Sequence, residues 1–319
     1  MESTAITEFS QFRKIVVTGG AGFIGSHLID RLVSGFSGEI VALDNLRRGN
    51  LANLSHHGDR VRFVEGDIRS FDTVEGVLEG ADLVFHLGAQ SNVLGAVQDI
   101  TYSFTTNVDG TFNVLRAAAS RGVSRVVFSS SREVYGDVTE LPVLEATPLA
   151  PKNAYGASKA AGELYCGVFQ KAGLEVRILR LANVYGTRDH GRVIPLFVGR
   201  ALRGEPLILY GGDQVIDFIE VGLVAAAMVR AASCPELPEP VNVASGQGMT
   251  VRELAERVQA ATGASVPIQV QPRREQEVVG YVGDAARARQ LLDLPRPADP
   301  LFGLARVIEW LREQAPTTS

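Results

Sequence analysis

The fold is decided by the stretch Thr18-Gly19-Gly20-Ala21-Gly22-Phe23-Ile24-Gly25. It follows a short β-branched run, Ile15–Thr18, which predicts a strand, and it precedes the amphipathic segment Ser26–Val33, which predicts a helix. A strand, a glycine-rich turn and a helix in this order are typical of the first crossover unit in a dinucleotide-binding sheet. Because glycine also serves ordinary turns, the stretch needs support from the residues around it.

Three glycines of this stretch stand three residues apart. Gly19 permits the tight turn, Gly22 lets the backbone approach a pyrophosphate, and Gly25 allows the helix to pack closely on the strand. The helix N-terminus, where Phe23 and Ile24 lie, supplies backbone amides to an anion. We therefore expect a dinucleotide to bind here.

The second expected strand, Ile40–Asp44, ends in a carboxylate about 25 residues after Gly19, near the distance expected for a ribose-binding acid. A carboxylate there repels a 2′-phosphate and so favours NAD over NADP. Arg47 and Arg48 follow closely enough to keep NADP open. The alternative is an aspartate that only caps the turn after its strand.

The same pattern recurs along the first part of the chain: a short β-branched run, a turn, and a longer amphipathic segment. This alternation is typical of parallel crossover units, so we predict an α/β fold, a Rossmann-type doubly wound parallel sheet. The six strands expected in one sheet are Ile15–Thr18, Ile40–Asp44, Val61–Glu65, Leu83–Leu87, Arg125–Ser129 and Val176–Arg180.

After Arg180 the pattern changes, because turn clusters such as Tyr185-Gly186-Thr187 divide shorter periodic segments. We expect a smaller α/β substrate-binding lobe there, with helices at Val251–Thr262 and Leu301–Glu313. The expected division gives residues 12–182, with roughly 216–242 returning, to the dinucleotide-binding domain, and residues 183–215 and 243–319 to the lobe.

The composition is that of a globular protein and argues against a nucleic-acid partner. Of 319 residues, 45% are apolar and 21% charged, and the formal charge is −5. A protein that neutralises a phosphate backbone needs a surplus of basic residues, which this chain lacks.

The cysteines and the first residues bear on the compartment. Cys166 and Cys234 form neither a disulfide framework nor a thiol-rich metal site, so we expect a reducing cytoplasm and no bound metal. The segment Met1 to Arg13 lacks the pattern of a signal peptide, and no apolar run is long enough to span a membrane. A soluble, unanchored protein is expected.

A second chemical signal is the pair Tyr155 and Lys159, four residues apart on one face of an expected helix. A nearby ammonium stabilises phenolate over phenol, so we expect the pKa of Tyr155 to fall toward working pH. Ser129-Ser130-Ser131 ends a strand at the carboxyl edge of the sheet, where ligands bind. Each of these pieces alone would be ordinary, but together they indicate an active site downstream of a nucleotide loop.

Asp67-Ile68 ends the third expected strand, where the pair could flank an adenine. The alternative is a strand-terminal aspartate that makes a turn.

In these motifs the chain resembles the extended short-chain dehydrogenase/reductases, especially the NAD-dependent nucleotide-sugar (NDP-sugar) epimerase/dehydratase branch, over nearly its whole length. The resemblance rests on Thr18 to Gly25, Asp44-Asn45-Leu46, Phe85-His86-Leu87-Gly88-Ala89-Gln90, Asn107-Val108-Asp109-Gly110-Thr111, Ser129 to Gly136, Tyr155 to Lys159, and Arg180-Leu181-Ala182-Asn183-Val184-Tyr185-Gly186.

The resemblance implies NAD as cofactor and a role for each matching residue. The catalytic set is Tyr155 as acid/base, Lys159 as its electrostatic partner, Ser131 as the hydroxyl that bonds the reacting sugar oxygen, and Glu133. The cofactor set is Gly19, Gly22, Phe23, Ile24, Gly25, Asp44, Asn45, Asp67, Ile68, Leu87, Gly88, Ala89, Gln90, Asn107, Ser129, Tyr155 and Lys159. The substrate set is Gln90, Ser91, Ser131, Arg132, Asn183, Arg192 and Arg274, with Asn183 facing the substrate diphosphate.

Family members share a first step, in which a phenolate takes the C4 hydroxyl proton while the C4 hydride passes to the nicotinamide, giving a 4-keto sugar. The leading hypothesis is an NDP-sugar 4-epimerase, with a UDP-hexose or UDP-hexuronate as substrate. The alternatives are an NDP-sugar dehydratase or UDP-glucuronate decarboxylase that uses Glu133, and a nucleotide-binding regulatory protein without chemistry.

The residue before Glu133 bears on that choice. The 4,6-dehydratases place an Asp where Arg132 stands, and a guanidinium cannot donate a proton at neutral pH. The acid that the dehydratases use for loss of water is therefore absent. UDP-glucuronate decarboxylases resemble the chain in having a Glu where Glu133 stands, but they carry a Ser where Arg132 stands.

Two arginines are candidates for the anionic parts of the substrate. Arg192 could face C6 of the sugar and read a carboxylate there, or it could instead bind the diphosphate or face solvent. Ile216 stands where many relatives carry a diphosphate-binding arginine, so Arg273 and Arg274 become candidates for that charge.

Relatives commonly form homodimers through two helices of each subunit. The segments Val108–Ser120 and Ala157–Ala172 are the candidates for such an interface.

Overall fold

The computed structural model describes residues 9, 11–237 and 240–314. The segment considered above as a signal peptide lies largely outside the described residues, and so do residues 315–319 of the expected lobe. In the described part of the chain, none of the helices combines the length and the apolar character that crossing a bilayer takes.

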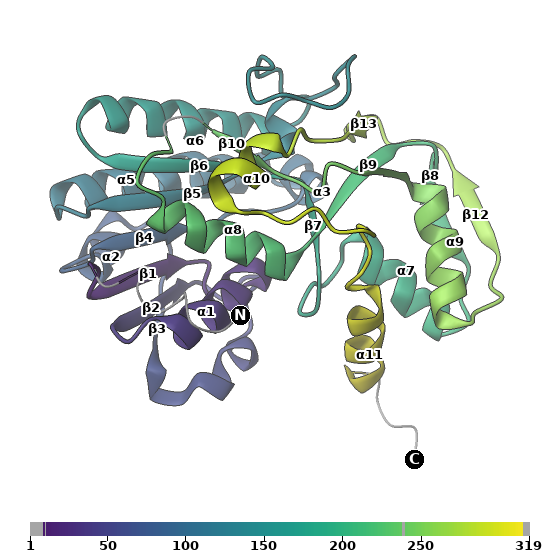
Figure 1. Cartoon of the computed structure of the whole chain (residues 1–319), viewed down its shortest axis with the longest axis horizontal. Coiled ribbons are helices and arrows are strands. Elements are labelled where there is room, and N and C mark those ends of the chain that lie inside the picture. The colour runs from purple at the N-terminus through teal and green to yellow at the C-terminus, as the bar shows by residue number, and fades with distance from the viewer. Residues whose placement is uncertain (1–8, 10, 238–239, 315–319) are drawn as a thin grey trace.

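The larger sheet has seven parallel strands in the order β10-β6-β5-β4-β1-β2-β3 (Figure 1). All six expected strands are present, and the sheet order makes it doubly wound from β1 outward. The strands are β1 (Lys14–Thr18), β2 (Glu39–Asp44), β3 (Val61–Glu65), β4 (Leu83–His86), β5 (Arg125–Ser131), β6 (Glu175–Leu181) and β10 (Val241–Val243).

The seventh strand, β10, was not expected as a member of this sheet. It has only three residues, and it pairs with Leu179–Leu181 at the end of β6. A run that short carries no periodic pattern of its own, so only its tertiary partner reveals it.

Helices cover both faces of the sheet, as Figure 1 shows. Successive strand residues point to opposite faces: Ile15 and Val17 join one apolar cluster, whereas Val16 joins the other. Both faces are thus buried, which explains the nearly continuous apolar runs of these strands. Helices α1 (Phe23–Gly35) and α8 (Val221–Ser233) cover one face, and α2 (Phe71–Val77), α5 (Gly110–Ser120) and α6 (Ala154–Lys171) cover the other.

Short helical segments connect these elements. The helices α3 (Val93–Gln98) and α4 (Ile100–Phe104) and the π-helical turn η3 (Thr105–Asp109) lead into α5, so the helix expected at Val108–Ser120 begins two residues later. The 3-10 turns are η1 (Leu51–Asn53), η2 (Ser55–Arg60) and η4 (Arg132–Val134).

A second group of strands and helices encloses a third apolar cluster on the right of Figure 1. A four-stranded sheet contains β11-β9-β13, with β7 paired to β9, and a two-stranded sheet pairs β12 with β8. The strands are β7 (Asn183–Tyr185), β8 (Leu207–Tyr210), β9 (Val215–Glu220), β11 (Gly248–Thr250), β12 (Ile268–Gln271) and β13 (Gly280–Tyr281), and the helices are α7 (Val193–Leu202), α9 (Val251–Thr262) and α11 (Leu304–Gln314). Helix α10 (Ala286–Leu292) packs instead on α8 and β10, beside the larger sheet.

The chain crosses between the two sheets more than once. After β9 in the smaller sheet, α8 packs on α1 and β10 joins the larger sheet, and the chain then returns to the smaller sheet as β11. The helix expected at Val251–Thr262 is α9, whereas the one expected from Leu301 starts at Leu304, after a turn.

Candidate active site

A cavity of about 1120 Å³ lies at the carboxyl ends of the larger sheet's strands and is closed by the smaller lobe. This edge is where ligands bind in open α/β sheets. All the predicted site residues line the cavity except Asp67, Asn107 and Arg273, the alternative to Arg274. The fold therefore gathers residues that are far apart in the sequence into one site.

The glycine-rich turn has the shape that the sequence predicted. Gly19 has a φ of 71°, and a Cβ atom on it would lie 2.8 Å from the backbone nitrogen of Gly88. A Cβ on Gly25 would lie 2.1 Å from the carbonyl oxygen of Gly19, so only glycine lets the helix pack this closely. Gly22 is the N-cap of α1 and provides no side chain to its first amides, which stay available to a phosphate.

Asp44, at the end of β2, stabilises the glycine-rich turn by hydrogen bonds. Its carboxylate accepts hydrogen bonds from the backbone nitrogens of Ala21, at 3.1 Å, and Leu46, at 2.9 Å. Burial raises the pKa of Asp44, and these amides oppose that rise. The aspartate caps its turn and also lines the cavity, so the two readings of this residue are compatible.

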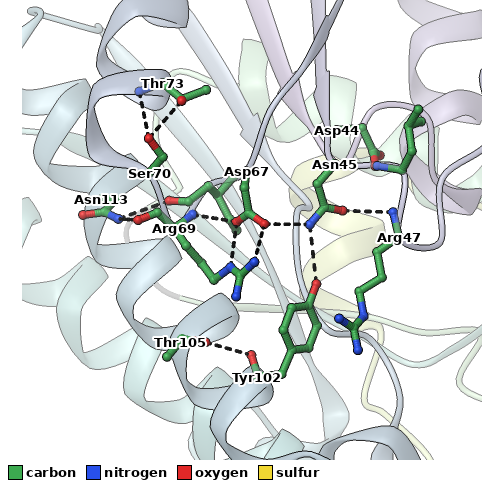
Figure 2. A network of polar contacts seen from close by, with 12 residues as sticks. Asp44, Asn45, Arg47, Asp67, Arg69, Ser70, Thr73, Tyr102, Thr105 and Asn113 are labelled. Carbon is green, nitrogen blue, oxygen red and sulfur yellow. Dashed lines mark hydrogen bonds and ion pairs between the residues drawn. The ribbon is translucent and has the colours of Figure 1, made fainter.

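Asp67 belongs to a polar network beside the cavity rather than to the cavity wall (Figure 2). Its carboxylate accepts from Arg69 Nε at 3.0 Å and Nη2 at 2.8 Å, and from Asn45 Nδ2 at 2.9 Å. Burial works to raise the pKa of Asp67, but these donors lower it to about 2. Ile68 and Asn45 line the cavity. Asp67 does not, but it positions Asn45 through their hydrogen bond.

Tyr102, which carries no sequence motif, also lines the cavity. The guanidinium of Arg47 lies 3.7 Å above its ring, and the Tyr102 hydroxyl lies 3.5 Å from Asn45 Nδ2 (Figure 2). Arg48 points elsewhere and donates to the carbonyl of His190, at 3.2 Å. Arg47 and Arg48, the two arginines that could have bound the 2′-phosphate of NADP, are thus in contact with other groups.

Asn107 acts on the cavity through another residue. It is buried, accepts from the Gln90 backbone nitrogen at 2.7 Å and donates to the Gln90 carbonyl at 3.0 Å. Its amide also donates to Ser158 Oγ at 2.9 Å. Asn107 therefore fixes the segment after β4 against α6, which positions Gln90 at the wall.

The Tyr155, Lys159 and Ser131 side chains converge as expected. Lys159 Nζ donates to the carbonyl of Ser129 at 2.8 Å, and burial lowers its pKa to about 8. The Ser131 hydroxyl lies close enough to the phenol of Tyr155 to lower the pKa of that phenol. Asn153, the N-cap of α6, holds the start of this helix by accepting from Gly156 N at 2.9 Å.

The expected direction of the Tyr155 pKa is wrong for the protein groups alone. Burial raises that pKa, while the Ser131 hydrogen bond and the charge of Arg192 oppose the rise. Loss of water around the phenol outweighs the favourable charges, because a phenolate is costly to bury.

Glu133 is buried and both of its carboxylate oxygens are engaged. Arg132 Nη2 lies 2.7 Å from Oε1, and Asn153 Nδ2 donates to Oε2 at 2.8 Å. Arg132 also donates from Nε to Asn183 Oδ1. Arg132, Glu133 and Asn183 therefore form one chain of contacts along the cavity wall.

The expected anion-binding arginines differ in position. Arg192, at the N-cap of α7, lines the cavity and donates from Nη1 to the buried carboxylate of Asp189 at 2.8 Å. Arg274 lines the cavity, lies 3.6 Å above the Tyr210 ring and donates to Glu277 at 3.0 Å. Arg273 pairs with exposed Asp213 instead and is not part of the wall.

Several further residues of the wall were not predicted, among them Tyr102, Asp189 and His190. Asp189 and His190 follow the Asn183 to Gly186 motif after two residues, so their place in the chain was a usable signal. Tyr102 had none, because its position depends on how α4 packs.

Comparisons with known proteins identify the family of the chain. Residues 15–244 match the profile of the NAD dependent epimerase/dehydratase family. A putative UDP-glucose 4-epimerase of Methanocaldococcus jannaschii is 35% identical and covers 95% of this chain and 100% of its own.

Two solved structures have the same fold. The UDP-glucose 4-epimerase of Thermotoga maritima with UDP-glucose is 31% identical, has a TM-score of 0.89, and covers 94% of this chain and 99% of its own. A dTDP-glucose 4,6-dehydratase of Streptomyces venezuelae with NAD bound is 34% identical, has a TM-score of 0.90, and covers 94% of this chain and 97% of its own. With its glycine turn and its Tyr155–Ser131 pair, the chain is an NAD-dependent enzyme of the nucleotide-sugar epimerase type and belongs to the NAD-dependent epimerase/dehydratase family.

Proposed function

We propose that this enzyme is a 4-epimerase of a UDP-hexose or UDP-hexuronate. The observation that carries the proposal is the place of Tyr155, Ser131 and Lys159 on one cavity wall, with Lys159 one helical turn from Tyr155. Relatives with the names of UDP-glucose 4-epimerases support the substrate class.

The residues present fit NAD. The uncapped amides at the start of α1 suit the pyrophosphate, and a Cβ at Gly19 would fill space that the turn needs. Asp44 and Asn45 would hold the adenosine end, between Ile68 and Tyr102. When bound, NAD supplies the acceptor and donor of the C4 hydride.

The chain's own residues would handle the proton. Tyr155 Oη takes the proton of the C4 hydroxyl, and the neighbouring Ser131 hydroxyl orients that hydroxyl by a hydrogen bond to the C4 oxygen. The charge of Arg192 favours phenolate against the effect of burial. Lys159, whose ammonium donates to the Ser129 carbonyl, is proposed to add to this effect once the cofactor is bound. After the 4-keto sugar has rotated to present its other face, Tyr155 returns the proton to the C4 oxygen.

The state of Glu133 supports epimerisation over loss of water or carbon dioxide. A carboxylate that moves a proton at C5 needs a free oxygen, but Arg132 and Asn153 occupy both oxygens of Glu133.

Arg192 supports a hexuronate as the substrate, although the diphosphate remains the alternative ligand. One of its nitrogens is bound to Asp189, and the rest of the guanidinium remains available to a carboxylate. Its charge acts on Tyr155, so it lies near the reacting end of the sugar. Replacing Arg192 by Ala should reduce kcat/KM for UDP-glucuronate by at least tenfold more than for UDP-glucose, and equal losses for both would contradict the carboxylate role.

The diphosphate would lie toward Arg274 and Asn183. Ile216 lines the cavity and brings no charge, while the guanidinium of Arg274 is held over Tyr210. We propose that Arg274 takes over the neutralisation of the diphosphate.

The experiment that tests the function is incubation of the purified protein with UDP-glucose, UDP-glucuronate and dTDP-glucose, followed by product mass and C4 stereochemistry. Epimerisation leaves the mass unchanged and inverts C4. Products lighter by water or carbon dioxide contradict the proposal, and nucleotide binding without turnover of any sugar would instead favour a regulatory protein.

We also propose that the enzyme is a homodimer. The expected interface helices α5 and α6 contact each other, and α6 exposes Leu164, Tyr165 and Val168. Leu164 is 69% exposed and Val168 is 60% exposed, and the two lie on one helical face. A contiguous exposed apolar surface of this kind is typical of a subunit interface.

A further inference from the structure

Outside the cavity, three side chains converge between α1 and η2. His56 Nε2 lies 3.0 Å from Asp30 Oδ1, and His57 Nε2 lies 2.7 Å from the same oxygen. The three ligand atoms lie within 4.8 Å of one another. We propose that Asp30, His56 and His57 form a binding site for a first-row transition metal ion such as Zn²⁺.

The convergence of two imidazoles on one carboxylate oxygen is the main support. Without a metal, each Nε2 carries a proton and donates it to Oδ1. In the other neutral tautomer, each Nε2 presents a lone pair toward the same point. Zinc–nitrogen bonds are about 2.0–2.1 Å long, so tetrahedral ligand atoms stand about 3.4 Å apart, and an opening of about half an ångström would admit the ion.

A second group of contacts orients the carboxylate and leaves Oδ1 to the ion. Arg188 Nη1 lies 2.8 Å from Asp30 Oδ2, and His27 Nδ1 lies 3.9 Å from that oxygen. Partners of this kind fix the direction of a metal-ligating carboxylate. The positive charge of Arg188 also weakens cation binding, so we expect a modest affinity.

The ligand set selects the class of metal. Two imidazoles and one carboxylate suit Zn²⁺, Ni²⁺ and Cu²⁺, whereas Mg²⁺ and Ca²⁺ prefer sets of oxygen ligands. Three protein ligands leave room for water at the ion. The expectation of no metal considered only the cysteines, and neither His56-His57 nor Asp30 is a metal motif by itself.

The site lies apart from the chemistry. None of Asp30, His56 and His57 lines the cavity. The ion would join α1 to η2, and through Asp30 and Arg188 it would be linked to the segment between β7 and α7. A ligand that binds only the folded chain raises its thermal stability, so occupancy should be visible as a shift in Tm.

The test is a titration of the full-length protein, freed of any polyhistidine tag, with ZnCl₂ against a chromophoric chelator. Wild type should bind one equivalent, and MgCl₂ should not compete. His56→Gln and Asp30→Asn should each weaken zinc binding at least tenfold. His190→Gln removes an exposed histidine that lies elsewhere and should bind zinc as wild type does.

A second measurement guards against a folding defect. The His56 side chain is 49% exposed, so His56→Gln should retain the Tm of wild type without metal. Zinc should then raise the Tm of wild type and of His190→Gln but not that of His56→Gln. No zinc binding by wild type, or equal binding by wild type and His56→Gln, would overturn the proposal.

Discussion

Tyr155 lies between opposing electrostatic influences. Burial and the charge of Glu133 raise its pKa, whereas the Ser131 hydrogen bond and the charges of Arg192 and Arg132 lower it. At neutral pH the phenol therefore keeps its proton until it meets a partner that stabilises the phenolate. This behaviour suits a group that must both remove and return a proton.

Replacing Tyr155 by Phe should lower kcat by about 10²–10⁴-fold, the usual contribution of a general acid/base. Binding of NAD and of the nucleotide sugar should persist, since only one hydroxyl is removed. Steady-state kinetics and NAD content measure the two effects. Tyr165→Phe, on the exposed side of the same helix, is the matched control and should retain kcat, and a similar loss in both variants would contradict the role of Tyr155.

At Asp67 the pH dependence of stability can be worked out. Its pKa is lowered to about 2, so the folded chain binds its proton less readily than the unfolded chain. The stabilisation is fully present above the ordinary aspartate pKa, near 4, and is lost as the pH falls through about 2. The Arg69 side chain is 43% exposed and that of Asp67 is 24% exposed, so solvent screens the pair and we expect only about 1 kcal/mol from it.

Asp67→Asn should therefore lower the free energy of unfolding by about 1 kcal/mol at pH 7, and the difference from wild type should shrink below pH 4. Urea unfolding at several pH values measures this. Asp59→Asn changes an exposed aspartate before the other end of β3 and serves as the control. A difference between Asp67→Asn and wild type that persists undiminished at low pH would contradict the assignment.

At the scale of elements, α6 is held to the sheet by a buried ion pair. Arg180 Nη2, from β6, lies 2.7 Å from Glu163 Oε2, and the two side chains are 6% and 5% exposed. Ser130 Oγ, from β5, also donates to Glu163. These contacts fix the helix that carries Tyr155 and Lys159 against the strands that carry the serines.

Glu163→Ala should destabilise the protein by about 3–5 kcal/mol, because it leaves the Arg180 charge buried without its partner. The free energy of unfolding in urea measures the loss. Changing both residues, as Glu163→Leu with Arg180→Met, should recover much of it, since no charge is then buried. If the double variant is no more stable than Glu163→Ala, the pair is not the cause.

At the scale of the whole molecule, the two lobes meet around the cavity, and the second lobe has its own apolar cluster. Tyr185 ties its parts together, because its hydroxyl donates to the carbonyl of Pro300 at 2.8 Å and accepts from Gly303 N at 3.1 Å. The chain's passage between the sheets at α8 and β10 couples the lobes covalently.

The proposed dimer can be tested at this scale. Light scattering should give about twice the chain mass of 34.2 kDa for wild type. Replacing Leu164 and Val168 together by Glu should yield a monomer, because charges cannot be buried in an apolar interface. Val270→Glu adds a charge at an exposed apolar residue of the other lobe and should leave the mass unchanged. A wild-type monomer would refute the dimer.

Sequence patterns were sufficient for what depends on neighbours in the chain. The glycine turn, six of the seven sheet strands, and the pairing of Tyr155 with Lys159 on one helix follow from periodicity and local geometry. Nearly all the predicted site residues line one cavity, because the carboxyl ends of parallel strands must meet at one edge.

By itself, then, the sequence determined the α/β architecture and the dinucleotide loop, and it placed Tyr155 and Lys159 on one helix. Only the tertiary structure decided what distant groups do to one another. The three-residue strand β10 and the place of Tyr102 at the cavity were visible only in the structure. The same holds for the position of Asp67 outside the cavity wall and for the contacts of both Glu133 carboxylate oxygens. The physical reason is that burial, ion pairing and pKa depend on which side chains surround a group in space, and those come from far apart along the chain.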